Sequence, residues 1–245
     1  MKVLGVIPAR YASTRFPGKP LVQINGKSMI ERVYLQASTS SRLDMVMVAT
    51  DDQRIADEVI RFGGRVQMTS ATHQSGTDRC AEVAGHYPEF DVIINIQGDE
   101  PYIDPEQIDL LVSCFDLPST KLATLIKEIH TQDELFNTNI PKVIVNTSGE
   151  ARYFSRQTIP FIRGKAEADW LSAHQFYKHI GIYGYDALTI QALTQLTPST
   201  LECAESLEQL RWLENGYSVQ TRTTTIETIA IDSPEDLLKL SAFKD

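Results

Sequence analysis

Apolar and polar positions alternate along the first half of the chain in two distinct ways. Short runs that are apolar almost throughout are separated by segments whose apolar residues recur three and four positions apart. The first pattern is typical of buried strands and the second of helices, and their alternation indicates a parallel sheet covered by helices on both faces. The strand-like runs are residues 2–8, 45–50, 65–68 and 91–97, and the helix-like segments are residues 28–38, 51–63, 77–87 and 105–115.

From about Lys121 the rhythm changes. Several strand-like segments follow one another with little helix between them, and helical spacing returns only near the C-terminal end. No repeat, linker or break in composition divides the chain. We therefore expect one domain, residues 1–245, of the α/β class, with a mostly parallel sheet flanked by helices and an inserted, partly antiparallel subregion at about residues 121–185. The later strands are predicted at residues 121–129, 142–146, 151–155 and 176–185, a loop at 159–175, and helices at 187–196 and 204–216.

The composition narrows the class of protein. A hydrophobic share of 42% with 22% charged residues is ordinary for a globular domain. The net charge of −9 and a pI near 5.1 argue against a nucleic-acid partner, because binding a phosphate backbone needs a broad basic face. No run of 18 apolar residues exists, and the first apolar run is too short for a signal peptide. We expect a cytoplasmic protein without a membrane partner.

The three cysteines, Cys80, Cys114 and Cys203, are widely spaced and form no C-x-x-C pair. An odd number without paired spacing does not favour zinc or a disulfide framework. Each lies in a segment with helical spacing, so we expect all three to be small buried side chains.

The loop after the first strand carries the first chemical signal. The segment from Met1 to Ile30 contains five bases and no acid, in a protein that is acidic overall. Ligands of parallel α/β sheets bind at the carboxyl ends of the strands, so this loop is placed to meet an anion. No G-x-G-x-x-G is present, and "NGKS" at residues 25–28 lacks the earlier P-loop glycine because that position is Leu21. For "NGKS" we expect a turn and a helix cap.

Each of three further motifs is compatible with two interpretations when only its local sequence is considered. "HQSGTDR" (residues 73–79) is either a ligand loop or a plain helix start capped by Thr77 or Asp78. "INIQGDEP" (residues 94–101) ends an apolar strand at Asp99, which suits a catalytic carboxylate or a turn. Asp232 in "IDSPEDL" suits a metal carboxylate or the start of a helix.

Taken together and in order, the motifs resemble those of the 3-deoxy-manno-octulosonate (Kdo) cytidylyltransferases. The resemblance extends from Ile7 to Leu237 and implies a Rossmann-like nucleotidyltransferase sheet. It implies transfer of CMP from CTP to Kdo with release of pyrophosphate, Mg²⁺ as cofactor, a cytoplasmic homodimer and a role in lipopolysaccharide synthesis. The strand-rich subregion would then bind the sugar and form the dimer. The motifs are "IPARYASTRFPGKPL", "VATDD", "HQSGTDR", "INIQGDEP", "YFSR", "KHIGIYGY", "ESLEQLRWLENG" and "IDSPEDL".

The same resemblance implies roles for individual residues. Lys19, Asp99 and Asp232 would be catalytic, and the two aspartates would hold the metal. The nucleotide would be bound by Ala9, Arg10, Arg15, Lys19, Ser75, Gly76, Arg79, Gln97 and Gly98. The sugar acid would be bound by Gln97, Arg156, His179, Tyr183, Glu208 and Gln209.

Some alternatives stay open. Judged by its residue type alone, His179 on a strand is more often a satisfied core histidine, and Glu208 could pair with Arg211 three positions on. Asp186 departs from the family, which commonly has Arg there, so it either faces the sugar or only starts a helix. Cytidylyl transfer to an amino-modified Kdo or a sialic acid, and a non-catalytic nucleotide-binding regulator, are the competing functions.

Overall fold

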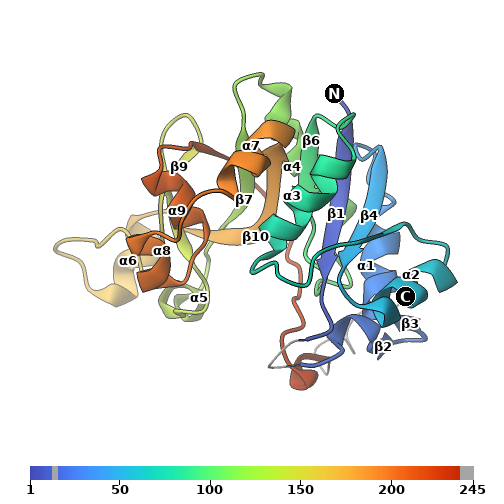
Figure 1. The fold of residues 1–245 in the computed structure, drawn as a ribbon. Coiled ribbons are helices and arrows are strands. Elements are labelled where there is room, and N and C mark those ends of the chain that lie inside the picture. Colours follow the sequence, from blue (N-terminus) through green and yellow to red (C-terminus); the bar gives the residue numbers. More distant parts are fainter. Residues whose placement is uncertain (13–15, 238–245) are drawn as a thin grey trace.

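A nine-stranded sheet forms the centre of the molecule, with helices packed on both of its faces (Figure 1). The computed structural model describes residues 1–12 and 16–237. Within these residues the strand order is β5-β4-β1-β6-β10-β7-β11-β9-β8. The α/β class expected from the sequence is confirmed.

The first half of the chain forms the parallel part of the sheet. Leu4 on β1 is in register with Met45 on β4 and with Ile93 on β6. These strands are buried on both faces, which explains why they are apolar throughout. All four predicted strands are found here: β1 (Val3–Ala9), β4 (Met45–Thr50), β5 (Val66–Met68) and β6 (Val92–Asn95).

The second half adds the antiparallel part. β10 runs antiparallel to both of its neighbours, β6 and β7, so it joins the two parts into one sheet. β8 and β9 pair antiparallel at the far edge, whereas β11 is parallel to β7. The partly antiparallel character of this subregion is confirmed. Its strands are β7 (Leu122–Glu128), β8 (Lys142–Val145), β9 (Glu150–Ser155), β10 (Tyr177–Asp186) and β11 (Val219–Thr223).

Two groups of helices cover the two faces of the sheet. One hydrophobic cluster contains the buried residues of α1 (Met29–Ala37), α2 (Gln53–Arg61) and α4 (Pro105–Val112). The other contains those of α3 (Gly76–His86), α7 (Ala187–Leu193) and α9 (Gln209–Glu214). The remaining described helical segments are α5 (Gln132–Phe136), α6 (Trp170–Ala173), α8 (Thr200–Glu205), the 3₁₀ turns η1 (Lys19–Leu21), η2 (Ser113–Asp116) and η3 (Glu167–Asp169), and a 3₁₀ segment at residues 234–237.

Three sequence predictions need correction. The single helix expected at residues 204–216 is interrupted at Ser206, whose φ of 52° is left-handed, so α8 ends at Glu205 and α9 begins at Gln209. The expected loop at residues 159–175 contains η3 and α6, because Trp170 is buried and anchors the segment on Phe176. Cys80 and Cys114 are buried as expected, but Cys203 is exposed, since the short helix α8 buries none of its side chains.

The "NGKS" segment forms a turn and a cap. Asn25 and Gly26 have φ angles of 46° and 79°, and they join β2 (Gln23–Ile24) to β3 (Lys27–Ser28). Such left-handed pairs suit Asn-Gly, the usual sequence of a two-residue hairpin turn. Ser28 then caps α1 by accepting a hydrogen bond of 3.3 Å from the Glu31 amide. The turn-and-cap interpretation is confirmed.

No helix in the described part of the chain is both long and apolar enough to cross a membrane.

Candidate active site

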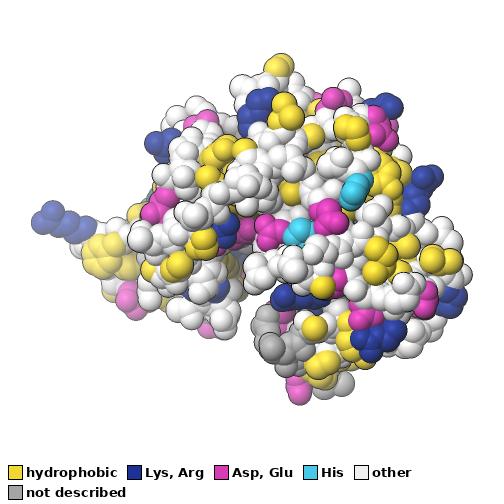
Figure 2. Space-filling model, viewed as in Figure 1, with side chains coloured by type: hydrophobic (Ala, Val, Ile, Leu, Met, Phe, Trp, Pro, Cys, Tyr) yellow, Lys and Arg dark blue, Asp and Glu magenta, His cyan; other side chains and the backbone are white. Residues whose placement is uncertain are grey.

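A cavity of about 270 Å³ opens where β1 and β6 end, between the chain segments that follow these strands. Figure 2 shows a hollow between the two halves of this face, with basic, acidic and histidine side chains gathered beside it. This is the edge at which open α/β sheets bind ligands. The cavity is lined by Pro8, Ala9, Arg10, Lys19, Pro20, His73, Gln74, Ser75, Gly76, Arg79, Gln97, Gly98, Asp99 and Asp232.

The fold therefore brings most of the predicted nucleotide and metal residues around one space. Arg15 lies outside the described residues. His73 and Gln74 also line the cavity although no role was predicted for them, and their membership of the "HQSGTDR" motif was the available signal. The predicted residues at the cavity are Ala9, Arg10, Lys19, Ser75, Gly76, Arg79, Gln97, Gly98, Asp99 and Asp232.

Lys19 lies between the two predicted catalytic carboxylates. Its Nζ donates to Asp99 Oδ2 at 2.8 Å and lies 3.9 Å from Asp232 Oδ1. It also donates to the Ile231 carbonyl at 2.8 Å, so it holds the backbone next to Asp232. The lysine starts η1 directly after Gly18, whose φ of 74° lies in the left-handed region that favours glycine. Three segments far apart in the sequence thus meet at one ammonium group.

The donor set at this point fits magnesium. Asp99 and Asp232 direct carboxylate oxygens toward the same cationic position, which Lys19 Nζ occupies. Mg²⁺ is commonly held in proteins by one or two carboxylates together with water and substrate phosphates. Residues 1–12 and 16–237 contain no group of three or more His, Cys, Asp or Glu that could form a cage for an ion. Two carboxylates beside a cavity of about 270 Å³ fit an ion held by two protein carboxylates together with water and substrate phosphates.

Gly98 lets the two strands approach each other closely at the cavity. A Cβ built on Gly98 would lie 2.9 Å from the Pro8 carbonyl oxygen, too close for any larger residue without a backbone shift. The glycine therefore holds the end of β6 against the end of β1. This contact brings Asp99 to the wall formed by Ala9 and Arg10.

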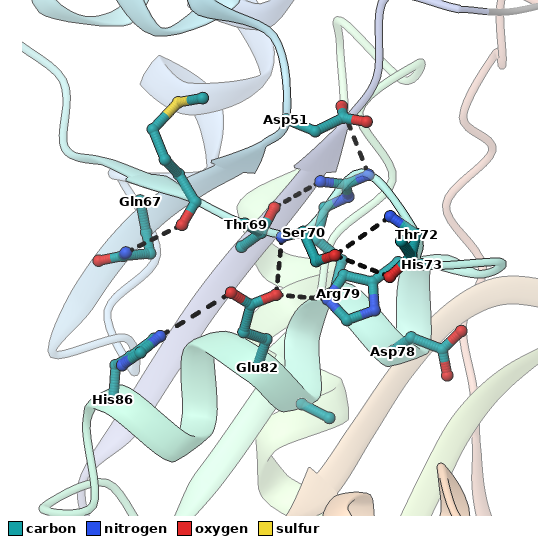
Figure 3. A network of polar contacts seen from close by, with 12 residues as sticks. Asp51, Gln67, Thr69, Ser70, Thr72, His73, Asp78, Arg79, Glu82 and His86 are labelled. Carbon is teal, nitrogen blue, oxygen red and sulfur yellow. Dashed lines mark hydrogen bonds and ion pairs between the residues drawn. The ribbon is translucent and has the colours of Figure 1, made fainter.

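The loop at residues 69–75 is held in place by α3 (Figure 3). Glu82 accepts a hydrogen bond of 2.9 Å from the Ser70 amide and is hydrogen-bonded to His73 Nε2, so one carboxylate holds both ends of the turn. Ser75 accepts from the Asp78 amide at 3.1 Å, and Asp78 accepts in return from the Ser75 amide at 3.0 Å. The helix cap is therefore Ser75, and the prediction of Thr77 or Asp78 as the cap was wrong by two or three residues.

Arg79 is an internal part of the same wall. Arg79 is only 4% exposed. Its guanidinium donates to Thr69 Oγ1 and lies 3.4 Å from Asp51 Oδ1 (Figure 3). A planar guanidinium held by two fixed partners keeps its charge in one place. Arg79 contributes positive charge to the cavity without needing to reorient.

Two hydrogen bonds connect the cavity to the predicted sugar residues. Gln97 Nε2 donates to the Gly181 carbonyl at 2.6 Å, at the irregularity in β10 between Ile180 and Tyr183. Thr77, which follows Gly76 of the cavity wall, donates to Glu208 Oε2 at 2.9 Å. β10 and the start of α9 therefore lie directly beside the cavity.

Three buried polar atoms beside the cavity have no hydrogen-bond partner within the described structure. They are Tyr183 OH, Gln209 Nε2 and Asn95 Oδ1, on residues that are 8%, 4% and 5% exposed. A buried unpaired polar group costs about 1–3 kcal/mol, so such groups call for an explanation at each site. Two of the three residues are in the predicted sugar set.

His179 and Glu208 are both shifted toward their neutral forms. Burial lowers the pKa of His179 to about 3, and the ring nitrogen Nε2 lies 3.1 Å from Thr124 Oγ1. Burial also raises the pKa of Glu208, although its hydrogen bond from Thr77 opposes the shift. Arg211 makes its ion pair with Glu202, at 2.5 Å, so a close pair of Glu208 with Arg211 is not formed.

Arg156 does not reach the cavity. Its guanidinium donates to three backbone carbonyls, those of Glu205, Thr138 and Ser206, at 2.6, 3.2 and 3.3 Å. It does not line the cavity, but Ser206 precedes Glu208 by two residues, so it adjoins the sugar set. Its predicted contact with a sugar carboxylate stays a prediction.

Asp186 acts as a helix cap. Its carboxylate accepts from the Thr189 amide at 3.1 Å and pairs with Lys121 at 3.1 Å. It lies at the C-terminal end of β10, opposite Val92 at the start of β6, whereas the cavity lies beyond the other end of β6. The interpretation of Asp186 as a helix-start residue is confirmed.

These features define a nucleotide-binding α/β enzyme site, and comparison with known proteins specifies the family. The profile of the cytidylyltransferase family matches residues 4–229. The chain is 58% identical over 243 residues to the 3-deoxy-manno-octulosonate cytidylyltransferase of Cytophaga hutchinsonii, covering 98% of this chain and 97% of that one. It is 57% identical to the Parabacteroides distasonis protein of the same name, covering 99% and 98% of the two chains.

A solved structure agrees with these relatives. The structure of a CMP:2-keto-3-deoxy-manno-octonic acid synthetase complexed with CTP is 43% identical, with a TM-score of 0.91 over 99% of this chain and 98% of that chain. A synthase of 4-diphosphocytidyl-2C-methyl-D-erythritol from Anaerococcus prevotii shares the fold at 12% identity and a TM-score of 0.61. The chain belongs to the cytidylyltransferase family.

Proposed function

We propose that this enzyme transfers CMP from CTP to Kdo, forming CMP-Kdo and pyrophosphate for lipopolysaccharide synthesis. The observation that carries the proposal is the full-length similarity to enzymes of that name, combined with a site whose nucleotide and sugar halves are joined by Gln97 and Thr77. The acid-free opening segment then has a physical reason. A nucleoside triphosphate carries about four negative charges, which acids at this position would repel.

The residues of the chain act mainly by positioning and by neutralising charge. Lys19 is placed to exchange its carboxylate contacts for phosphate oxygens when the triphosphate enters. Arg10 and Arg79 add positive charge to the same wall. In the proposed reaction the anomeric hydroxyl of Kdo attacks the α-phosphorus in line, and the bond to pyrophosphate breaks. Bringing two bound substrates into this geometry supplies much of the rate enhancement.

We propose Mg²⁺ as the cofactor, held by Asp99 and Asp232. When bound, the ion would neutralise phosphate charge and orient the phosphates for attack. The convergence of both carboxylates on Lys19 Nζ supports this placement. The test is binding of Mn²⁺ as a paramagnetic substitute, which should need both carboxylates.

The decisive experiment measures pyrophosphate release with each nucleoside triphosphate, with and without Kdo. Release that requires both CTP and Kdo supports the proposal. A parallel assay with amino-modified Kdo and a sialic acid separates the alternative sugar acids, because the favoured acceptor has the highest kcat/KM. CTP binding without release under any of these conditions would instead identify a nucleotide-binding regulator.

We also propose a homodimer formed through the subregion at residues 121–185. Phe161 is 73% exposed and Phe136 is 38% exposed, and their ring centroids lie 5.3 and 5.8 Å from that of Trp170, so two exposed aromatic side chains lie against one buried ring. Light scattering should report twice the chain mass, and Phe161→Glu should give monomers. Leu188→Glu is the matched control, because Leu188 is 82% exposed but lies outside the subregion. A monomeric wild-type protein would contradict the proposal.

The proposed location is the cytoplasm. The three cysteines are free in the structure, which is usual in a reducing compartment. Cell fractionation tests this directly.

A further inference from the structure

Asp232 reaches the site on a segment that has no regular secondary structure. After β11 ends at Thr223, residues 224–232 form neither helix nor strand. We call these residues the C-terminal strap; they are the red segment that runs down the middle of Figure 1 toward β2. Without a ladder or a helix of its own, the strap depends on other elements for its position.

Some of those contacts lie at the two ends of the strap. At its start, the Thr224 amide donates to the Ile126 carbonyl at 2.9 Å, continuing the pairing of β11 with β7. At its end, the Ile231 amide donates to the Asp99 carbonyl at 2.9 Å, and the Ile231 side chain is fully buried. The middle of the strap must span the distance between these two attachments.

A group of four charged residues holds the middle. Lys178 Nζ donates to both carboxylate oxygens of Glu227, at 2.8 and 3.0 Å, and also pairs with Glu134. Lys127 Nζ lies 2.7 Å from the Glu227 carboxylate and donates to the Thr225 carbonyl at 3.0 Å. We call Lys127, Glu134, Lys178 and Glu227 the four-charge cluster.

The cluster is built so that neither lysine is left without a counter-charge. Lys178 is only 5% exposed, and a buried ammonium needs paired carboxylates to remain charged. Burial lowers the pKa of Lys178, but its hydrogen bonds to Glu134 and Glu227 outweigh burial and raise it overall. A charged Lys178 bound to two oxygens of Glu227 fixes the carboxylate in direction as well as in distance.

The positions of these residues in the chain connect two parts of the site. Lys178 directly precedes His179 on β10, whereas Glu227 precedes Asp232 by five residues on the strap. Glu134 lies on α5, and its partner in the cluster is Lys178 rather than a residue of the strap. Within the cluster, Glu227 is the member that lies on the strap, and its carboxylate joins the strap to Lys178 of β10. β7 also reaches the strap backbone directly, through Lys127 and the Thr225 carbonyl, and Gln107 of α4 donates to the Ile226 carbonyl at 3.2 Å.

We propose that Glu227 is a positioning residue, which holds the C-terminal strap through Lys127 and Lys178 so that Asp232 meets Lys19 and Asp99. The inference rests on the proposed function for its catalytic consequence, but the placement of the strap can be measured without any reaction. Glu227 touches no substrate in this proposal. It acts through Asp232.

The kinetic test compares two variants of one ion cluster. Glu227→Gln keeps the size of the side chain and should lower kcat at least tenfold, with less than threefold change in the KM for either substrate. Glu134→Gln removes the other carboxylate from the same lysine, yet should leave kcat within threefold because α5 does not carry the strap. Equal losses in both variants would overturn the proposal, since they would show a general structural role.

A second comparison asks whether the effect passes through Asp232. In an Asp232→Asn background, Glu227→Gln should lower kcat by less than a further twofold, because the residue that it positions is already disabled. A full additional tenfold loss would show an independent role and overturn the inference.

The third measurement needs no turnover. Hydrogen–deuterium exchange of peptides from residues 224–232 should be at least tenfold faster in Glu227→Gln, while peptides from α1 and β4 stay unchanged. Unchanged strap exchange would overturn the placement of Glu227 even if activity fell. Faster exchange in a protein without CMP-Kdo synthesis would leave the placement intact and reject only the proposed function. If Glu227→Gln does not fold, Lys127→Met weakens the same attachment, and the same exchange measurement decides.

Discussion

Lys19 Nζ lies 2.8 Å from Asp99 Oδ2, although 80 residues separate the two in the chain. The pair joins the acid-free loop after β1 to the end of β6, and it forms the point to which the C-terminal strap attaches. A cation and a carboxylate in contact can each be replaced by a component of a metal–triphosphate complex. In the proposed reaction Lys19 would exchange Asp99 for a phosphate oxygen of the triphosphate, and Asp99 would exchange Lys19 for the metal ion.

The two aspartates should be essential for turnover. Asp99→Asn and Asp232→Asn each remove one negative charge from the predicted metal site while keeping the side-chain size. We expect kcat to fall on the order of 10²–10³-fold, the size seen when one preorganised electrostatic contact is lost. Steady-state pyrophosphate release measures the effect, and circular dichroism checks the fold. A variant with nearly wild-type kcat at saturating Mg²⁺ would remove that residue from the metal site.

Lys19→Met should weaken the handling of CTP far more than that of Kdo. A lost charge-assisted phosphate contact costs roughly 1.5–3 kcal/mol, so the KM for CTP should rise about ten- to a hundredfold. Lys27→Met is the matched control, because Lys27 belongs to the same acid-free segment but does not line the cavity. If Lys19→Met raised only the KM for Kdo, the placement of the loop at the triphosphate would be wrong.

His179 should make the protein less stable in mild acid. Its folded pKa of about 3 lies below the ordinary value of 6.5, so the unfolded chain binds the extra proton and the folded chain does not. Stability therefore falls as the pH drops below 6.5, by at most about 1.4 kcal/mol per pH unit, until the folded pKa is reached.

The measurement is urea unfolding of the wild type and His179→Gln at pH 7 and pH 5. The wild type should lose about 2 kcal/mol more of its unfolding free energy between these pH values than the variant does. Identical losses in the two proteins would show that His179 titrates normally in the folded state.

Asp186→Arg should affect stability more than sugar binding. The substitution removes the cap of α7 and places a positive charge beside Lys121, which should cost about 0.5–2 kcal/mol of unfolding free energy. The KM for Kdo should change less than threefold, because Asp186 lies at the end of β10 away from the cavity. A tenfold improvement, about 1.4 kcal/mol, would show substrate contact and favour an amino-modified sugar.

Most of the secondary structure, and most of the residues that line the cavity, could be predicted from the sequence alone. The strands β1, β4, β5 and β6 and the helices beside them follow from the two periodicities, because these depend only on neighbours a few residues apart. Ordered motifs also pointed to the residues that the structure gathers around one cavity. Those motifs are local stretches at strand ends, where a parallel sheet necessarily brings ligand-binding groups together.

Tertiary structure alone decided how distant segments meet. The sequence of residues 177–186 predicts a strand, but it does not predict that this strand pairs antiparallel with β6 and β7, because the pattern of side chains along a strand does not specify its neighbours in the sheet. The burial of Trp170 and the exposure of Cys203 were likewise set by packing. The strap shows neither helical nor strand periodicity, so the sequence does not predict where it lies. Its attachment through Glu227 depends on lysines contributed by β7 and β10. The position of Asp232 beside Lys19 depends in turn on that attachment.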